Sequence, residues 1–197
     1  VFEGVRELLA DDGVLWLNLG DSYGHGTSAS RKASTTSTKI SAAQHEAQGG
    51  RHGGPAKQLL GIPWRVALAM QDAGWLLRQE VIWEKPNSMP ESVTDRCVKS
   101  HEHLFLMAKS VRYRFDHKAI QETGANGEKR NKRSVWSVPT KPFKGAHFAV
   151  FPPDLIQPCI KAGSQPGEVV FDPFIGSGTT AQVAQALGRQ WIGCELN

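Results

Sequence analysis

Two acidic residues and a glycine-rich turn near the end of the chain have a spacing suited to binding a nucleotide-type cofactor. An apolar segment over residues 169–171 runs into Asp172, and Gly176, Ser177 and Gly178 follow it. With Ala181 they fit the pattern G-x-G-x-x-A, in which glycine permits a tight turn and a close approach of ligand to backbone. Glu195 follows Asp172 by 23 residues. An acid at that spacing is expected at the tip of the next strand, where it accepts hydrogen bonds from ribose hydroxyls.

The charge of Asp172 narrows the choice of cofactor. A carboxylate beside the turn repels a pyrophosphate and suits a ligand that carries an ammonium group, such as S-adenosylmethionine. Two alternatives stay open at this point. The turn could be a tight connection with a solvent-facing Glu195 and no ligand, or it could bind NAD in a nucleotide-cofactor oxidoreductase.

The elements that must position these residues alternate between strands and helices. Hydrophobic patterning and punctuation by glycine and proline predict helices over residues 1–10, 63–74, 154–162 and 181–187. Apolar runs predict strands over residues 14–19, 76–83, 102–108, 169–171 and 191–194. This order predicts an α/β, doubly wound, mostly parallel sheet of Rossmann-like type. The length of 197 residues suits one domain.

Two segments interrupt this pattern. Residues 24–57 contain five basic residues against one acid and only one large aliphatic, so we expect a flexible insertion that cannot bury a core. Residues 121–144 form a basic loop region, and no acid occurs between residues 129 and 153. Basic side chains neutralise DNA phosphates. The alternatives are a passive surface insertion over residues 24–57 and an ordinary solvated loop over residues 129–144. The candidates for DNA contact are Arg31, Lys32, Lys39, Arg51, Lys57, Lys129, Arg130, Lys132 and Arg133.

Composition excludes several classes of protein. No run of about 18 apolar residues exists and no N-terminal signal is visible, so the expected location is the cytoplasm. The three cysteines are too far apart for a disulfide framework or a CxxC zinc site, and His101-Glu102-His103 lacks metal-ligand spacing, so no metal is predicted. Trp16, Trp83 and Trp191 lie in apolar runs and are predicted core residues, whereas Trp136 suits either core or DNA contact.

The motif DPFIGSGTT at residues 172–180 resembles the cofactor motif of bacterial and phage DNA amino-methyltransferases, which methylate N4 of cytosine or N6 of adenine. Four further blocks are similar to this family: LWLNLGDSY (15–23), GIPWRVALAMQDAGWLLRQEVIWEKPNSMPESVTDRC (61–97), HEHLFLMAKS (101–110) and HFAVFPPDLIQPCI (147–160). In the permuted β class of the family the catalytic half precedes the cofactor half, which matches the late position of the glycine-rich turn.

The resemblance implies a role for each candidate residue. Asp172 lies near the methionine ammonium, Glu195 holds the ribose, and the glycines pass under S-adenosylmethionine. Asp21 and Tyr23 face the target base. The implied cofactor-binding residues are Asp172, Pro173, Phe174, Gly176, Ser177, Gly178, Thr179, Thr180, Glu195 and Phe151.

One element of the family's chemistry is missing from these residues. The family's catalytic tetrapeptide is Ser/Asp-Pro-Pro-Tyr. Its polar groups accept hydrogen bonds from the exocyclic amine of the target base, and its aromatic ring stacks on the flipped base. The motif normally precedes the first helix, and it does not occur in the chain. No catalytic residue is therefore assigned, and we expect an N-terminally incomplete enzyme, inactive alone. The resemblance implies double-stranded DNA as partner, with a cognate restriction endonuclease as a further partner. A non-catalytic DNA-binding module derived from a methyltransferase is the alternative of a different class.

Overall fold

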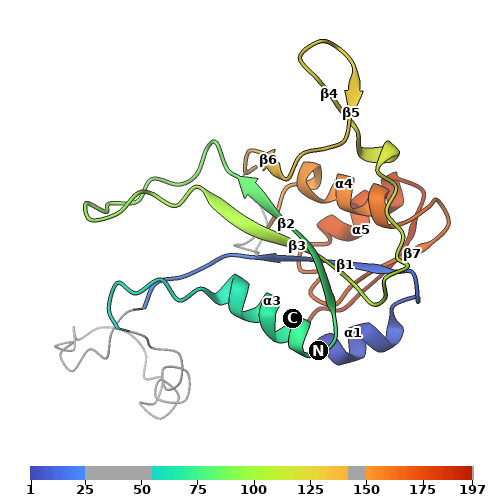
Figure 1. Ribbon diagram of the computed structural model, residues 1–197, viewed down its shortest axis with the longest axis horizontal. Coiled ribbons are helices and arrows are strands. Elements are labelled where there is room, and N and C mark those ends of the chain that lie inside the picture. Colours follow the sequence, from blue (N-terminus) through green and yellow to red (C-terminus); the bar gives the residue numbers. More distant parts are fainter. Residues whose placement is uncertain (25–54, 142–149, 197) are drawn as a thin grey trace.

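A mixed sheet with helices on both faces organises most of the molecule (Figure 1). The computed structural model describes residues 1–24, 55–141 and 150–196. The four-stranded sheet has the order β1-β3-β2-β6. Its members are β1 (Val14–Leu19), β2 (Leu76–Glu84), β3 (His101–Ala108) and β6 (Val135–Ser137). Helices α1 (Phe2–Leu8) and α3 (Ile62–Asp72) lie on one face, and α4 (Pro153–Gly163) lies on the other.

The C-terminal part adds a β-α-β unit. Strand β7 (Val169–Asp172) leads through the glycine-rich turn to helix α5 (Thr179–Ala186), and β8 (Gln190–Gly193) pairs with β7 in parallel. The register places Asp172 opposite Gly193. Helix α5 packs on α4 through the cluster formed by Ile156, Ile160 and Val183. Residues that follow one another directly in the sequence thus build the whole unit.

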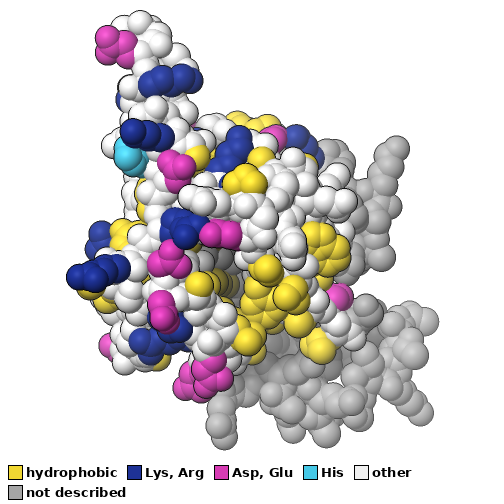
Figure 2. All heavy atoms as spheres, turned by 90° about the vertical axis from the view of Figure 1, so that its right-hand side faces the viewer, with side chains coloured by type: hydrophobic (Ala, Val, Ile, Leu, Met, Phe, Trp, Pro, Cys, Tyr) yellow, Lys and Arg dark blue, Asp and Glu magenta, His cyan; other side chains and the backbone are white. Residues whose placement is uncertain are grey.

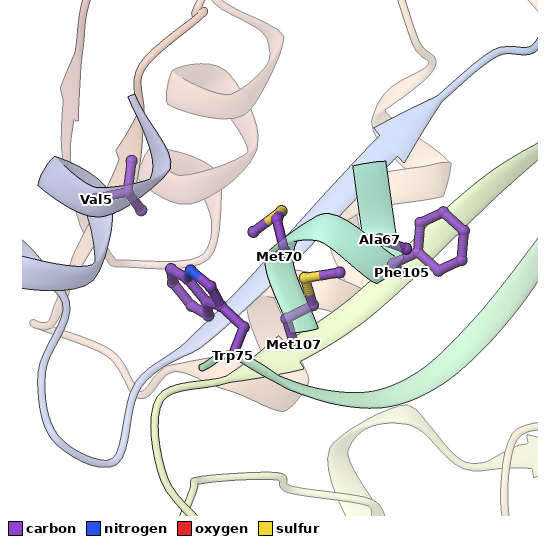
Figure 3. Close-up of a cluster of buried hydrophobic side chains, with 6 residues drawn as sticks. All are labelled: Val5, Ala67, Met70, Trp75, Phe105 and Met107. Atoms are coloured by element: carbon purple, nitrogen blue, oxygen red, sulfur yellow. The ribbon is translucent and has the colours of Figure 1, made fainter. Parts of the chain in front are cut away.

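Strand β3 is buried on both faces because its alternating side chains enter two different clusters. Phe105 and Met107 point toward α3, where Trp75, Met70 and Ala67 surround them, with Val5 of α1 in the same cluster (Figure 3). On the opposite face Leu104 packs with Val81, Trp83, Trp136, Leu155 and Cys159. Burial of a side chain such as Phe105, which is fully buried, stabilises the folded state by about 1.5–3 kcal/mol. This strand is therefore the centre of the molecule.

A short hairpin projects from the body after β3. A 3-10 helix η1 (Lys118–Ile120) leads into β4 (Glu122–Thr123), which pairs antiparallel with β5 (Lys129–Arg130). The hairpin stands clear of the sheet in both orthogonal views (Figures 1 and 2). The sequence predicted only a basic loop over residues 121–144, because strands of two residues carry no detectable apolar alternation.

The predicted α/β class is confirmed, but the largest sheet differs from the mostly parallel one expected. Strand β3 is antiparallel to both β1 and β2, whereas β2–β6 and β7–β8 are parallel. A parallel neighbour requires a crossover connection. Residues 85–100 link β2 to β3 without a helix, so the two strands pair as an antiparallel ribbon. No helix of the described ranges is long and apolar enough to cross a membrane.

Candidate functional site

The glycine-rich turn adopts a conformation that its glycines make possible. Gly176 has φ +49° and Gly178 has φ +85°, both in the left-handed region that side chains with a Cβ rarely adopt. The amide of Gly178 donates to the carbonyl of Ile175 at 2.9 Å, which closes the turn. A Cβ at Gly178 would meet no atom of the described residues within 4 Å, so the surface above the turn is open. Helix α5 therefore starts at an accessible backbone edge.

Asp172 fixes the start of this turn. Its Oδ1 accepts a hydrogen bond from the amide of Phe174 at 2.9 Å, and its Oδ2 accepts one from the hydroxyl of Thr180 at 2.5 Å. The side chain is half-buried, and a carboxylate oxygen has a second acceptor position. Asp172 can thus hold the turn in shape and still accept a hydrogen bond from a cationic ligand.

Glu195 reaches the turn from the end of β8. Its Oε2 accepts a hydrogen bond from the amide of Gly176 at 2.8 Å, and its Oε1 accepts one from Leu196 at 3.0 Å. The turn also packs on β8, because a Cβ on Gly193 would overlap the side chain of Ile175. Glu195 is exposed. The structure therefore brings the acid and the glycines together as their spacing predicts, with the carboxylate open to solvent.

The other predicted cofactor residues lie around this turn in different settings. Thr179 and Thr180 are buried at 8% and 9% exposure, and the hydroxyl of Thr180 is committed to Asp172. Ser177 Oγ lies 3.4 Å from Thr179 Oγ1. Phe174 is 65% exposed. Pro173 is half-buried, and Phe151 packs between the two hydrophobic clusters that α4 joins.

Asp21 has a structural task at the carboxyl end of β1. Its Oδ2 accepts a hydrogen bond from the amide of Gly61 at 3.1 Å, and its Oδ1 accepts one from Ile62 at 3.0 Å. Helix α3 has no side-chain cap of its own, since its N-cap residue is Gly61. Asp21 therefore satisfies amides that a helix N-terminus leaves unpaired. The place of this carboxylate beside the target base rests on the family pattern alone.

Tyr23 also has protein partners. The guanidinium of Arg96 lies 4.1 Å from the centre of its ring, and its backbone forms an isolated bridge with Leu59. Hydrogen bonds from Gly24 to Gln58 and from Lys57 to Gly24 tie the two strands of this bridge. The insertion thus leaves and re-enters the domain at one point. Residues 25–54 lie outside the described ranges, and with them the predicted DNA-contact residues Arg31, Lys32, Lys39 and Arg51. The flexible insertion therefore stays a prediction.

Sequence reasoning missed Lys99 at this junction. Its ammonium donates to the carbonyl of Asp21 at 2.7 Å. Burial lowers the pKa of Lys99, an effect that the charges of Asp21 and Glu102 oppose. Nearby, Lys85 forms an ion pair with Glu102. A single lysine in a loop has no sequence pattern, so only the contact identifies it.

The predicted DNA-contact residues that the structure describes fall into two places. Lys57 is exposed and pairs with Asp95 at 2.6 Å, next to the base of the insertion. Lys129 and Arg130 lie on strand β5, and Arg133 follows it. Arg130 and Arg133 both donate to Oε1 of Glu122, at 2.9 Å and 2.7 Å.

The aromatic predictions are corrected in part. Trp83 is buried, and Trp136, left open between core and DNA contact, is buried at 5% exposure, with the ammonium of Lys132 lying 5.0 Å from its ring centre. Trp191 is 47% exposed, so its assignment to the core is wrong for the described part of the chain. Strand β8 pairs there with β7 alone, which leaves Trp191 at a sheet edge.

Two other features are separate from the turn. His103 hydrogen-bonds Glu80 at 2.6 Å, and the described residues hold no group of three or more His, Cys, Asp or Glu able to bind a metal. A hollow of about 800 Å³ lies between α1 and α3, with Phe2, Arg6 and Met70 in its wall. It is open to solvent and shares no residue with the glycine-rich turn.

The comparisons with known proteins agree with this arrangement. The chain is 50% identical over its whole length to the type II methyltransferase M.XycI of Xanthomonas campestris pv. cyanopsidis, and 47% identical to M.Cfr9I of Citrobacter freundii. It spans 65% of the length of each of these two relatives.

Two solved structures are similar to the chain. The cytosine-N4-specific PvuII DNA methyltransferase superposes with a TM-score of 0.71 at 21% identity, over 98% of this chain and 62% of that one. The complex of M1.HpyAVI with S-adenosylmethionine superposes with a TM-score of 0.50 at 25% identity, over 70% of this chain and 64% of that one. The N6/N4 methyltransferase family, described as DNA methylase, matches residues 1–197. The chain belongs to the N6/N4 DNA methylase family.

Proposed function

We propose that the full-length protein transfers a methyl group from S-adenosylmethionine to an exocyclic amine, N4 of cytosine or N6 of adenine, in double-stranded DNA. The observation that carries this proposal is the exposed carboxylate of Glu195, held against the amide of Gly176 at the open turn between β7 and α5. Family membership and the 50% and 47% identical methyltransferases support the same activity.

The residues of the turn suit this cofactor. When bound, S-adenosylmethionine supplies a methyl group activated by its sulfonium centre. Glu195 would accept hydrogen bonds from the ribose hydroxyls in place of, or shared with, its amide donors. Asp172 would accept a hydrogen bond from the methionine ammonium, and the amides at the start of α5 add positive potential beside the turn. The solved M1.HpyAVI complex holds the same cofactor.

The chemistry at the base requires groups that free the lone pair of the exocyclic nitrogen. In the family these belong to the Ser/Asp-Pro-Pro-Tyr tetrapeptide, which does not occur in these 197 residues. This chain supplies the cofactor-binding turn, and its basic hairpin supports DNA as the substrate. We further propose a cytoplasmic location and a partner restriction endonuclease, which the type II designation of the relatives supports.

A binding and transfer experiment tests the proposal. Calorimetry on the full-length protein should show binding of S-adenosylhomocysteine and no binding of NAD. Tritium from the labelled methyl of the cofactor should then enter duplex DNA, and hydrolysis of that DNA should yield a base labelled on its exocyclic nitrogen. Preferential NAD binding would favour an oxidoreductase, and DNA binding without tritium transfer would favour a non-catalytic module.

A further inference from the structure

The β4–β5 hairpin has the form of a two-stranded ribbon with a narrow tip. Glu122 pairs with Arg130 and Thr123 pairs with Lys129. The amide of Gly124 donates to the carbonyl of Glu128 at 2.8 Å, and Gly127, at φ +83°, donates to Gly124 at 3.0 Å. Figure 2 shows the ribbon standing out from the body with basic side chains along it. Nothing in the described part of the chain packs over its tip.

The tip has a composition that suits contact with a ligand in a groove. Its residues are Gly124, Ala125, Asn126 and Gly127, so the backbone carries only one large side chain there, and that side chain is an amide. Residues 125–130 are all exposed. A Cβ at Gly127 would meet no described atom within 4 Å. A structural hairpin would instead use its tip or one face to pack against the body.

The stem carries an excess of positive charge that its own carboxylates do not balance. Between residues 118 and 133 five side chains are basic and two are acidic. Glu122 accepts hydrogen bonds from both Arg130 and Arg133, and these bonds orient two guanidinium groups on one side of the ribbon. The exposed ammonium of Lys129 lies 3.2 Å from the hydroxyl of Thr123. Such a stem attracts a polyanion along its length.

We propose that this hairpin enters the major groove of DNA as a two-stranded ribbon, with Asn126 contacting base edges and Lys129 contacting a phosphate. The major groove is wide enough for a β-ribbon, and an asparagine amide matches the N6 and N7 atoms of adenine. Asn126 is then a specificity-determining residue, while the stem residues position the ribbon. The inference rests on the proposed function, because it requires a DNA substrate.

The experiment uses the full-length protein with S-adenosylhomocysteine and a randomised duplex library from which its preferred site is selected. Asn126→Ala should lower the discrimination at one base pair of that site by about 10- to 100-fold and leave affinity for unrelated duplexes unchanged. Lys129→Ala should weaken binding to all duplexes equally and reduce the slope of log affinity against log salt by about one. Gln71→Ala and Arg112→Ala, both at exposed positions outside residues 118–133, are the controls and should change neither quantity.

Cofactor affinity, measured for each variant, shows that the protein is folded. If Asn126→Ala does not fold, Asn126→Asp replaces it, and a carboxylate at the tip should weaken binding to all duplexes. Undiminished discrimination in the Asn126 variant would overturn the assignment of the hairpin while DNA binding by the parent still stood. A parent that binds cofactor but no duplex would overturn the proposed function as well.

Discussion

Two regions of the molecule place a carboxylate at the end of a strand, yet the carboxylates differ in what they hold. At the β7–α5 turn, Asp172 and Glu195 accept hydrogen bonds from groups one to 19 residues away, and Glu195 is exposed. At the end of β1, Asp21 accepts hydrogen bonds from amides 40 and 41 residues away. The first arrangement leaves a carboxylate open to solvent, where we propose that the cofactor binds, whereas the second uses both oxygens to cap a helix.

The difference shows that a strand-end carboxylate cannot be assigned a role from its local sequence. Both sites lie at the end of an apolar strand. The two sites differ in the backbone groups that the fold places next to the carboxylate. A helix N-terminus with no cap of its own meets Asp21, while an open glycine turn meets Glu195.

The largest expected effect is a loss of cofactor affinity on substitution of Glu195. Glu195→Ala should weaken S-adenosylhomocysteine binding by about 2–4 kcal/mol, because two charge-assisted hydrogen bonds to the ribose are lost. The free energy of unfolding should change little, since the side chain is exposed. Isothermal titration calorimetry measures the affinity, with Glu3→Ala as a control on an exposed glutamate of α1. Equal affinities of parent and Glu195→Ala would remove this residue from the cofactor site.

Asp21→Ala tests the role of Asp21 as the cap of helix α3. Loss of the cap at α3 should lower the free energy of unfolding by about 1–2 kcal/mol. Cofactor affinity should be unchanged, because Asp21 and the glycine-rich turn share no contact among the described residues. Urea denaturation measures the stability, and Asp21→Asn, which keeps one acceptor oxygen, should lie between parent and alanine variant. Unchanged stability together with lost methyl transfer would restore the target-base role that the family pattern implies.

Two neighbouring threonines, Thr179 and Thr180, test whether the hydrogen bond to Asp172 stabilises the turn. Thr180→Val removes the hydroxyl that donates to Asp172 and should cost about 0.5–1.5 kcal/mol of unfolding free energy. Thr179→Val, at nearly the same burial, loses only a 3.4 Å contact with Ser177 and should cost less. Thermal denaturation with calorimetry ranks the two variants. Equal losses would mean that the bond to Asp172 does not hold the turn.

The smallest effect concerns the pH dependence at the β1 junction. Burial lowers the pKa of Lys99 below its ordinary value. Between the folded and unfolded pKa values the unfolded chain therefore binds more protons, and stability rises with pH in that window. Lys99→Met should remove this alkaline rise. Denaturation curves between about pH 8 and 11 cover the range in which an unperturbed lysine side chain loses its proton, and Lys118→Met, at an exposed position, should leave the slope intact.

Local signals in the sequence located most elements of the fold. The apolar run at residues 14–19 matches β1, and the segments at 76–83 and 102–108 match β2 and β3 to within one residue at each end. The glycine-rich turn and its acid were also predicted correctly in their spatial relation. The backbone freedom of glycine and the periodicity of apolar side chains are local properties of the sequence. The contiguous segment 168–195 was therefore enough to predict its own strands, turn and helix.

Other properties depended on residues far apart in the sequence. The antiparallel pairing of β3, the exposure of Trp191 and the burial of Trp136 required the positions of other elements. Lys99 contacts Asp21, which lies 78 residues away in the sequence. Strand partners and buried faces follow from which surfaces pack together, and no local pattern encodes that choice. The sequence by itself therefore determined the glycine-rich turn and the acid that lies beside it. The tertiary structure alone decided that Asp21 is a cap, because hydrogen-bond partners 40 residues apart meet only when the chain folds.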